Sequence, residues 1–419
     1  MRAMCQRLPA KDHQIFQRIQ REGISSRSAD RPRREVHRLR FLLYELSGYV
    51  YHCLPDTERV GGGFMADKTL LKGTEAMAEA ALRAGCQVYF GYPITPQSEL
   101  IEYMAKRMPE IGRTFLQAES EVAAVNMIYG AACTGTRVMT STSSPGFSLM
   151  MEGVSYIAGA VLPAVFINVV RGGPGLGDIQ PAQSDYFQGT KGGGHGDYRL
   201  IVLSPATIQE AVNMMFDAFD LADRYLNPVL IIADGLLGQM MEPVELPDFL
   251  MPDRMPNHDS WALRGKGTRK KHSVTSFDLD PLKLEEMNLA NFEKYRKIQQ
   301  KEVRYEEYLM DDAEVAFVAY GTMGRILKTT IRMAREAGIK AGMIRPITLW
   351  PFPEKPIQEA AKKVKMVMSV EMSMGQMVED VRLAVSGKVP TPFYGRTGGV
   401  VPTPTEVFEA LKREWEAIV

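Results

Sequence analysis

The alternation of short apolar stretches with longer amphipathic stretches most constrains how this chain can fold. Between residues 72 and 234, apolar stretches such as 88–92 and 164–170 are separated by helical patterns such as 97–106. Strands that are apolar along their whole length belong to parallel sheets covered by helices on both faces. The pattern therefore predicts an α/β fold built on a parallel sheet.

A second region of the same kind begins at Ala313, with strands predicted over 315–320, 341–344 and 366–370. Between the two regions, residues 242–312 are irregular at first and then strongly charged. The charged part, 281–309, has many opposite charges four residues apart and is predicted to be one long helix. We predict a first domain over 65–241, a linker with a long helix over 242–312, and a smaller α/β domain over 313–419.

The first 64 residues differ from the rest of the chain. They hold 12 Lys and Arg against 7 Asp and Glu, whereas the whole chain is neutral with 50 of each. They show neither a helical nor a strand period. We interpret them as a basic arm, either disordered or the product of a misassigned start codon, and we favour translation from Met65.

Composition excludes several function classes. A net charge of zero gives no reason to expect nucleic-acid binding, and no apolar run approaches the roughly 20 residues of a membrane span. The four cysteines are far apart and show no iron–sulfur or zinc spacing. We expect a cytoplasmic protein without a metal site or cluster of its own.

One glycine-rich segment superficially resembles a dinucleotide-binding loop. Residues 173–177 read Gly-Pro-Gly-Leu-Gly after a predicted strand, but Pro181 prevents a helix from starting there. A pyrophosphate would then lack the helix N-terminus that normally holds it. His195, also in a glycine-rich stretch, is interpreted as an exposed loop residue.

Polar side chains follow three of the predicted strands. Thr95 lies in a Pro-rich loop, Glu119 and Glu121 stand at the start of a helix, and Arg171 follows strand 164–170. Ligands of parallel α/β sheets gather at the edge where the strands end. Taken one by one, each has a simpler explanation: a helix cap for Thr95, first-turn acids for the two glutamates, and a solvated loop end for Arg171.

Taken together, these segments indicate a family. Over residues 65–419 the chain resembles the alpha-type subunit of 2-oxoacid:ferredoxin oxidoreductases. The segments that carry the resemblance are 91–96, 117–122, 170–175, 191–198, 319–325, 345–353 and 370–376. The Arg171 loop and the Gly-Gly-Gly-His-Gly-Asp-Tyr run are most similar to subunits of enzymes for 3-methyl-2-oxobutanoate, followed closely by those for 2-oxoglutarate.

The resemblance implies a fold, a cofactor and roles for some residues. The first domain would be of the pyrimidine-binding type of thiamine-diphosphate enzymes, and the second would resemble the transketolase C-terminal domain. Glu121 would be catalytic and touch the aminopyrimidine of the cofactor, beside cofactor-binding residues Tyr92, Pro93 and Ile94. Thr95 and Arg171 would bind the 2-oxoacid substrate.

The resemblance also implies partner subunits. The chain lacks the Gly-Asp-Gly…Asn segment that holds Mg²⁺ and the diphosphate of the cofactor. We expect a beta subunit with that segment, a ferredoxin-like subunit with the iron–sulfur clusters, and a gamma-type subunit.

The implied reaction is oxidative decarboxylation of a 2-oxoacid with coenzyme A, giving acyl-CoA, CO₂ and reduced ferredoxin. Two alternatives stay open at this stage. One is a thiamine-dependent carboligase subunit without redox chemistry, and the other is a partner subunit whose site has decayed.

Overall fold

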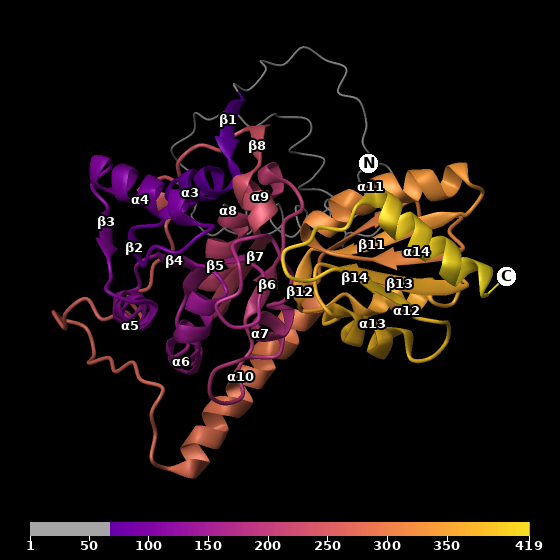
Figure 1. Ribbon diagram of the computed structural model, residues 1–419. Helices are drawn as coiled ribbons and strands as arrows, with labels where there is room; N and C mark the ends of the chain where they lie inside the picture. The colour runs from indigo at the N-terminus through magenta and orange to yellow at the C-terminus, as the bar shows by residue number, and fades with distance from the viewer. Residues whose placement is uncertain (1–67, 419) are drawn as a thin grey trace, which may run out of the picture. The chain divides into compact units, whose positions relative to one another are not determined.

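Residues 69–244 alternate between strands and helices, as the sequence predicts (Figure 1). The computed structural model describes residues 68–418, so the interpretation of residues 1–64 falls outside the described part of the chain. The elements of this half are β1 (Thr69–Lys72), α3 (Gly73–Arg83), β2 (Val88–Gly91), α4 (Ser98–Glu110), β3 (Thr114–Gln117), α5 (Glu121–Ala132), β4 (Val138–Thr142), α6 (Pro145–Gly159), β5 (Ala164–Val170), α7 (Tyr186–Thr190), β6 (Ile201–Leu203), α8 (Ile208–Tyr225), β7 (Pro228–Asp234), α9 (Gly235–Gln239) and β8 (Met241–Val244).

Seven strands form the first sheet, in the order β12-β6-β7-β5-β4-β2-β3. Its strands from the first half of the chain all pair in parallel, and the edge strand β12 from the second half is antiparallel to β6. Helices α3, α4 and α8 cover one face, and α5 and α6 cover the other (Figure 1). The predicted parallel sheet with two covered faces is confirmed.

The central strand β5 shows why its sequence is apolar throughout. Val165, Ile167 and Val169 pack under α3 and α8, whereas Phe166 and Val170 point to the α5 and α6 side. All five are buried. Burying such a side chain contributes about 1.5–3 kcal/mol each, so both faces of the sheet add to stability.

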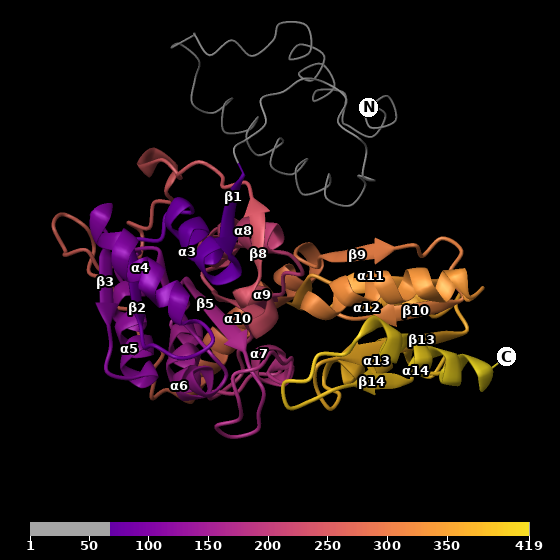
Figure 2. The same ribbon diagram turned by 45° about the horizontal axis from the view of Figure 1, so that its top comes forward.

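The second half of the chain carries its own five-stranded sheet, in the order β14-β13-β10-β11-β9, with β9 and β14 at its two edges (Figure 2). Helices α11 and α14 pack on one face, and α12 and α13 on the other. The elements are the 3₁₀ helix η2 (Pro252–Arg254), α10 (Pro281–Lys301), β9 (Tyr305–Tyr308), β10 (Val315–Val318), α11 (Gly321–Glu336), β11 (Ala341–Pro346), β12 (Thr348–Trp350), α12 (Glu354–Ala360), β13 (Met366–Glu371), α13 (Met377–Val385), β14 (Phe393–Gly395) and α14 (Pro404–Glu416).

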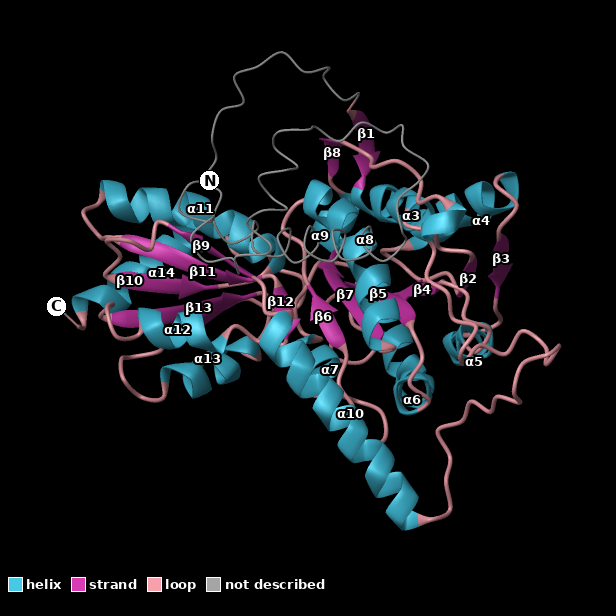
Figure 3. Ribbon diagram, turned by 180° about the vertical axis from the view of Figure 1, so that it is seen from behind, coloured by secondary structure: helices cyan, strands magenta, loops and turns pink. Residues whose placement is uncertain are grey.

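The segment predicted as one long helix over 281–309 divides into a helix and a strand. Asp280 accepts a hydrogen bond from the backbone N–H of Leu282 and caps α10, which ends at Lys301 (Figure 3). Tyr305–Tyr308 then pairs with β11 as an antiparallel edge strand, so the second sheet begins before Ala313. The prediction of a helix here was wrong because the charges of this strand resemble those of an exposed helix.

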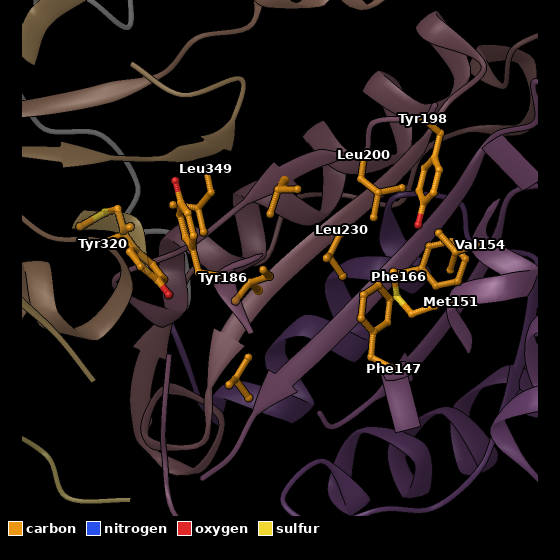
Figure 4. Close-up of a cluster of buried hydrophobic side chains, with 14 of the residues drawn as sticks. Phe147, Met151, Val154, Phe166, Tyr186, Tyr198, Leu200, Leu230, Tyr320 and Leu349 are labelled. Atoms are coloured by element: carbon orange, nitrogen blue, oxygen red, sulfur yellow. The ribbon is translucent and has the colours of Figure 1, made fainter. Parts of the chain in front are cut away.

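One hydrophobic cluster is shared by the two sheets (Figure 4). It joins Phe147 and Phe166 of the first sheet region, whose ring centroids lie 6.3 Å apart, to residues such as Val318 of the second. Tyr186 and Tyr320 meet at the junction, with ring centroids 5.8 Å apart. The described residues accordingly belong to one compact unit. No helix among them is long and apolar enough to cross a bilayer.

A buried arginine ties the second sheet to a helix of the first. Arg345 on β11 donates both terminal nitrogens to the Glu210 carboxylate of α8, at 2.9 and 3.2 Å, and its Nε to Glu306 at 2.6 Å. Lys328 also binds Glu306. Burial raises the pKa of Glu306, but Arg345 and Lys328 lower it more strongly, so this pKa lies below its usual value.

We predict that Arg345→Met destabilises the protein by about 3–5 kcal/mol at neutral pH, because two carboxylates lose their buried partner. The lowered pKa means that the contribution of Glu306 is present above about pH 4.3 and is lost as the pH falls through the folded-state value. Thermal unfolding of wild type and variant between pH 3 and 7 checks both effects. Arg345→Lys, which keeps the charge but cannot bridge both acids, is the control. Equal unfolding curves for wild type and Arg345→Met would contradict the prediction.

Candidate functional site

The predicted site residues all follow strands whose carboxyl ends share one edge of the seven-stranded sheet. Thr95 comes after β2, Glu121 after β3 and Arg171 after β5, and β4 lies between β2 and β5. These strands run parallel, so the loops that follow them emerge on the same side. This is the edge where parallel α/β sheets bind ligands.

The two candidate glutamates, Glu119 and Glu121, differ in how deeply they are buried. Ser120 caps α5 by accepting a hydrogen bond from the backbone N–H of Ala123 at 3.1 Å, which places Glu121 in the first helical turn. The side chain of Glu121 points inward, and the residue is 5% exposed, whereas Glu119 is exposed. A carboxylate in the first turn is favoured by the helix dipole. That simpler explanation accounts for its position in the helix but not for its burial.

The Glu121 carboxylate lies directly against the first turn of α6. A Cβ atom added at Gly146 would lie 2.5 Å from Glu121 Oε1 and 2.0 Å from Thr142 Oγ1. Neither contact is possible for a real Cβ, so this position requires glycine. Glu121 and Thr142 therefore flank the same small space at the end of β4.

Thr142 is one of several unpaired hydroxyl groups near the end of β4. Among the described residues, the buried hydroxyls of Thr140, Thr142 and Ser143 have no hydrogen-bond partner. Buried polar atoms are nearly always paired, so a group of unpaired ones marks a place where a bound molecule can supply the partners. These residues were missing from the sequence-based site. The sequence feature that could have identified them is the hydroxyl-rich run 140–144, which lies at the end of a buried strand just before Pro145 and Gly146.

Thr95 and Arg171 meet, but through the backbone of Thr95. Arg171 is 7% exposed and donates one terminal nitrogen to the carbonyl of Thr95 at 2.9 Å and the other to the carbonyl of Leu176 at 3.0 Å. Its Nε is buried and has no partner among the described residues. The guanidinium is thus buried, which excludes a solvated loop end, and both of its contacts are neutral acceptors.

The loop after β2 carries the other predicted contacts. Tyr92 and Ile94 are half-buried, Pro93 and Thr95 are exposed, and α4 begins only at Ser98, so Thr95 does not cap that helix. Thr95 lines an open cavity of about 480 Å³, together with Gly235 and Gln239 of α9, residues 179–181 and Val401. The structure thus places Thr95 beside Arg171, at a cavity. Glu121 lies at the same edge of the sheet, but it follows a different strand.

A buried hydrogen-bond chain connects the ends of β4 and β5. Asn168 on β5 is fully buried, and its Oδ1 accepts from the backbone N–H of Ser144 at 2.8 Å while its Nδ2 donates to Asp185 at 2.9 Å. The Ser144 hydroxyl in turn accepts from the backbone N–H of Arg171 at 3.1 Å. Burial raises the pKa of Asp185, although hydrogen bonds from Ser144 and Asn168 act in the opposite direction.

The segment that carries Asp185 is fixed to the second sheet. The Gln183 side chain accepts from the backbone N–H of Met372 at 3.0 Å and donates to the carbonyl of Tyr320 at 2.9 Å. Gln376 likewise accepts from the backbone N–H of Phe187 at 2.8 Å. His195, farther along the glycine-rich stretch, is exposed, as the sequence predicts.

Two family models match the chain. Residues 79–304 match the thiamine-diphosphate-binding model of pyruvate flavodoxin/ferredoxin oxidoreductases, and residues 313–407 match core domain II of pyruvate:ferredoxin oxidoreductase. The expected fold class, a pyrimidine-type parallel-sheet domain followed by a smaller α/β domain like the transketolase C-terminal domain, is confirmed.

Two curated relatives and one solved structure are similar over most of the chain. The ketoisovalerate oxidoreductase subunit VorB of Methanothermobacter marburgensis is 51% identical over 79% of this chain and 93% of the relative. The 2-oxoglutarate synthase subunit KorA of the same organism is 33% identical over 83% and 99%. The 2-oxoglutarate:ferredoxin oxidoreductase of Magnetococcus marinus, solved with 2-oxoglutarate, coenzyme A and succinyl-CoA, shares the fold with a TM-score of 0.74 at 24% identity, over 96% of this chain and 74% of that one.

Proposed function

Because this chain belongs to the pyruvate flavodoxin/ferredoxin oxidoreductase family, we propose that it is one subunit of an enzyme that oxidises 3-methyl-2-oxobutanoate. The products would be the branched acyl-CoA, CO₂ and reduced ferredoxin. The observation that carries the choice of substrate is the 51% identity to a ketoisovalerate oxidoreductase subunit, against 33% for a 2-oxoglutarate synthase subunit.

The site fits thiamine diphosphate. The unpaired hydroxyls near the end of β4, among them Thr142 beside Glu121, leave hydrogen-bonding positions for a polar ring, and Glu121 itself is a buried carboxylate in the first turn of a helix. When bound, this cofactor supplies the nucleophilic carbon and the electron sink that decarboxylation of a 2-oxoacid needs. Glu121 and the segment 92–94 would hold its aminopyrimidine.

Glu121 would hold a proton at the aminopyrimidine ring nitrogen. Such a carboxyl group works best where water is scarce and where its position is fixed. The burial of Glu121 supports this role over Glu119, which is exposed. Gly146 fixes its position, since it lets the first turn of α6 pack directly on the carboxylate.

Arg171 would bind the substrate carboxylate, assisted by Thr95. Its Nη2 donates to the Leu176 carbonyl, which belongs to an exposed glycine-rich loop. A hydrogen bond to a carboxylate is roughly twice as strong as one to a neutral carbonyl. A 2-oxoacid carboxylate could therefore take the place of Leu176, while the bond to the Thr95 carbonyl keeps the guanidinium in position.

Partner subunits would complete the enzyme. This chain has no Gly-Asp-Gly segment for Mg²⁺ and the diphosphate, so a beta subunit would hold that end of the cofactor. A ferredoxin-like subunit would carry the electrons, and a gamma-type subunit would complete the complex. The alternative of a carboligase without redox chemistry would need no iron–sulfur partner.

The first test compares substrates. We predict that the chain alone turns over neither acid, and that the complex purified with its beta and ferredoxin-like subunits reduces ferredoxin with a higher kcat/KM for 3-methyl-2-oxobutanoate than for 2-oxoglutarate. Coenzyme A-dependent reduction of ferredoxin is the measurement. A preference for 2-oxoglutarate would refute the substrate assignment, and carboligation without ferredoxin reduction would refute the reaction.

Glu121→Gln keeps the size of the side chain but removes the ionisable carboxyl group that gives and takes the proton. We predict a loss of roughly 10²- to 10⁴-fold in turnover of the assembled complex, the usual range for a general acid–base group. Hydrogen–deuterium exchange at C2 of the bound cofactor, measured by NMR after quenching, should slow in parallel. Glu119→Gln is the matched control and should have little effect. If Glu121→Gln exchanges as fast as wild type, the role of Glu121 is wrong and Glu119 becomes the first candidate.

Arg171→Ala should raise the KM for the 2-oxoacid roughly 10- to 150-fold, since a hydrogen bond to a charged group contributes about 1.5–3 kcal/mol. Arg171→Lys should recover only part of the loss because lysine lacks the planar pair of donors. The KM for coenzyme A, measured in the same complexes, serves as the control. An unchanged KM for the 2-oxoacid would mean that Arg171 only supports the loop.

A further inference from the structure

The β4–α6 turn, residues 143–146, includes the first two residues of α6 and touches both halves of the proposed site. At one end the Ser144 hydroxyl accepts from the backbone N–H of Arg171 at 3.1 Å. At the other end Gly146 lies so close to the Glu121 carboxylate and the Thr142 hydroxyl that a Cβ atom would not fit. A shift of this turn would therefore move Arg171 and Glu121 together.

The turn itself depends on one side chain of a neighbouring strand. The hydroxyl of Ser144 makes no capping bond to α6, and its backbone N–H is instead held by Asn168 Oδ1 at 2.8 Å. Asn168 stands opposite Thr142 in the register of β4 and β5, one position before the turn begins. It is the amide in an otherwise apolar strand, and a buried amide is costly unless both its donor and its acceptor are used.

Asp185 uses the remaining donor of Asn168. Asn168 Nδ2 donates to Asp185 Oδ2 at 2.9 Å, which fixes the orientation of the amide so that its oxygen faces Ser144. Asp185 lies between Gln183 and Phe187, which are held by hydrogen bonds to Met372 and Gln376 in the segment that joins β13 to α13. The chain of contacts thus runs from the second sheet through Asp185 and Asn168 to the turn.

We infer that Asn168, oriented by Asp185, is a positioning residue that sets the geometry of Glu121 and Arg171 through the turn at residues 143–146. The inference rests on the proposed function, since it assigns the purpose of the pair to those two side chains. It predicts that disturbing the pair changes proton exchange at the cofactor and binding of the 2-oxoacid at the same time.

The test exchanges the donor and the acceptor of the pair in the assembled complex. Asn168→Asp removes the donor and places a second carboxylate against Asp185. It should slow C2 exchange and raise the KM for the 2-oxoacid, each by roughly 10- to 100-fold, as expected for a displacement of about 1 Å. Adding Asp185→Asn restores one donor and one carboxylate in reversed order, so the double variant should regain most of both losses. Asp185→Asn alone, which keeps an acceptor for Asn168, should resemble wild type.

Asn227→Asp is the matched control. Asn227 is equally buried, but it lies just before β7, at the amino ends of the strands and away from the site. Its side chain donates to the carbonyls of Arg199 and Pro228. It should lower the unfolding temperature of the complex without changing C2 exchange or the KM for the 2-oxoacid. Calorimetric titration with thiamine diphosphate and Mg²⁺ adds a readout independent of turnover, and it should show weakened binding for Asn168→Asp and recovery in the double variant.

Three results would overturn the inference: unchanged C2 exchange and KM in folded Asn168→Asp, a change in only one of them, or no recovery in the double variant. Failure of the proposed function is a separate result, because Glu121→Gln and Arg171→Ala would then have no effect either. If those two variants behave as predicted and Asn168→Asp does not, only the positioning role is refuted.

Discussion

The parallel direction of neighbouring strands is the constraint on which the rest of this structure depends. Because β2, β3, β4 and β5 run the same way, the segments after them emerge at one edge of the sheet. The central strands β4 and β5 are buried on both faces, where polar groups are costly unless they are paired. The chemistry of the candidate site therefore lies at the strand ends, where Glu121, Arg171 and the hydroxyls of Thr142 and Ser143 are found.

Sequence patterns were sufficient for the parts of the fold that repeat. The apolar strands and amphipathic helices of residues 72–234 follow from periodicity. The same pattern puts Glu121 and Arg171 at strand ends, whereas the roles predicted for them came from the family resemblance. The strand β9 could not be predicted, because Tyr305–Tyr308 has the charges of a solvated helix and becomes a strand only by pairing with β11. The pairing of β12 with β6 likewise depends on contacts between distant parts of the chain.

In the candidate site, too, local features could be predicted from the sequence, whereas contacts between distant parts of the chain could not. The place of Glu121 at the start of a helix could be predicted, but its burial against Gly146 could not, since that contact joins α5 to α6. The contact of Arg171 with the Thr95 carbonyl was also beyond the sequence, because a motif specifies side chains and not which backbone oxygen they reach. Asn168 was overlooked because a single amide in the stretch 164–170 hardly changes its apolar average. Its meaning appears only when its partners, Ser144 and Asp185, are known.

The edge strand β12 has a consequence for how this protein is made. Thr348–Trp350 belongs to the seven-stranded sheet, although all the other strands of that sheet end by Asp234. During synthesis, the edge of β6 stays without its neighbour while more than a hundred further residues are added, and an open strand edge is a template for pairing with other chains. The nascent chain thus has a period of exposure to aggregation that ends only when β12 has left the ribosome. Cutting the chain between its two sheets would make that exposure permanent.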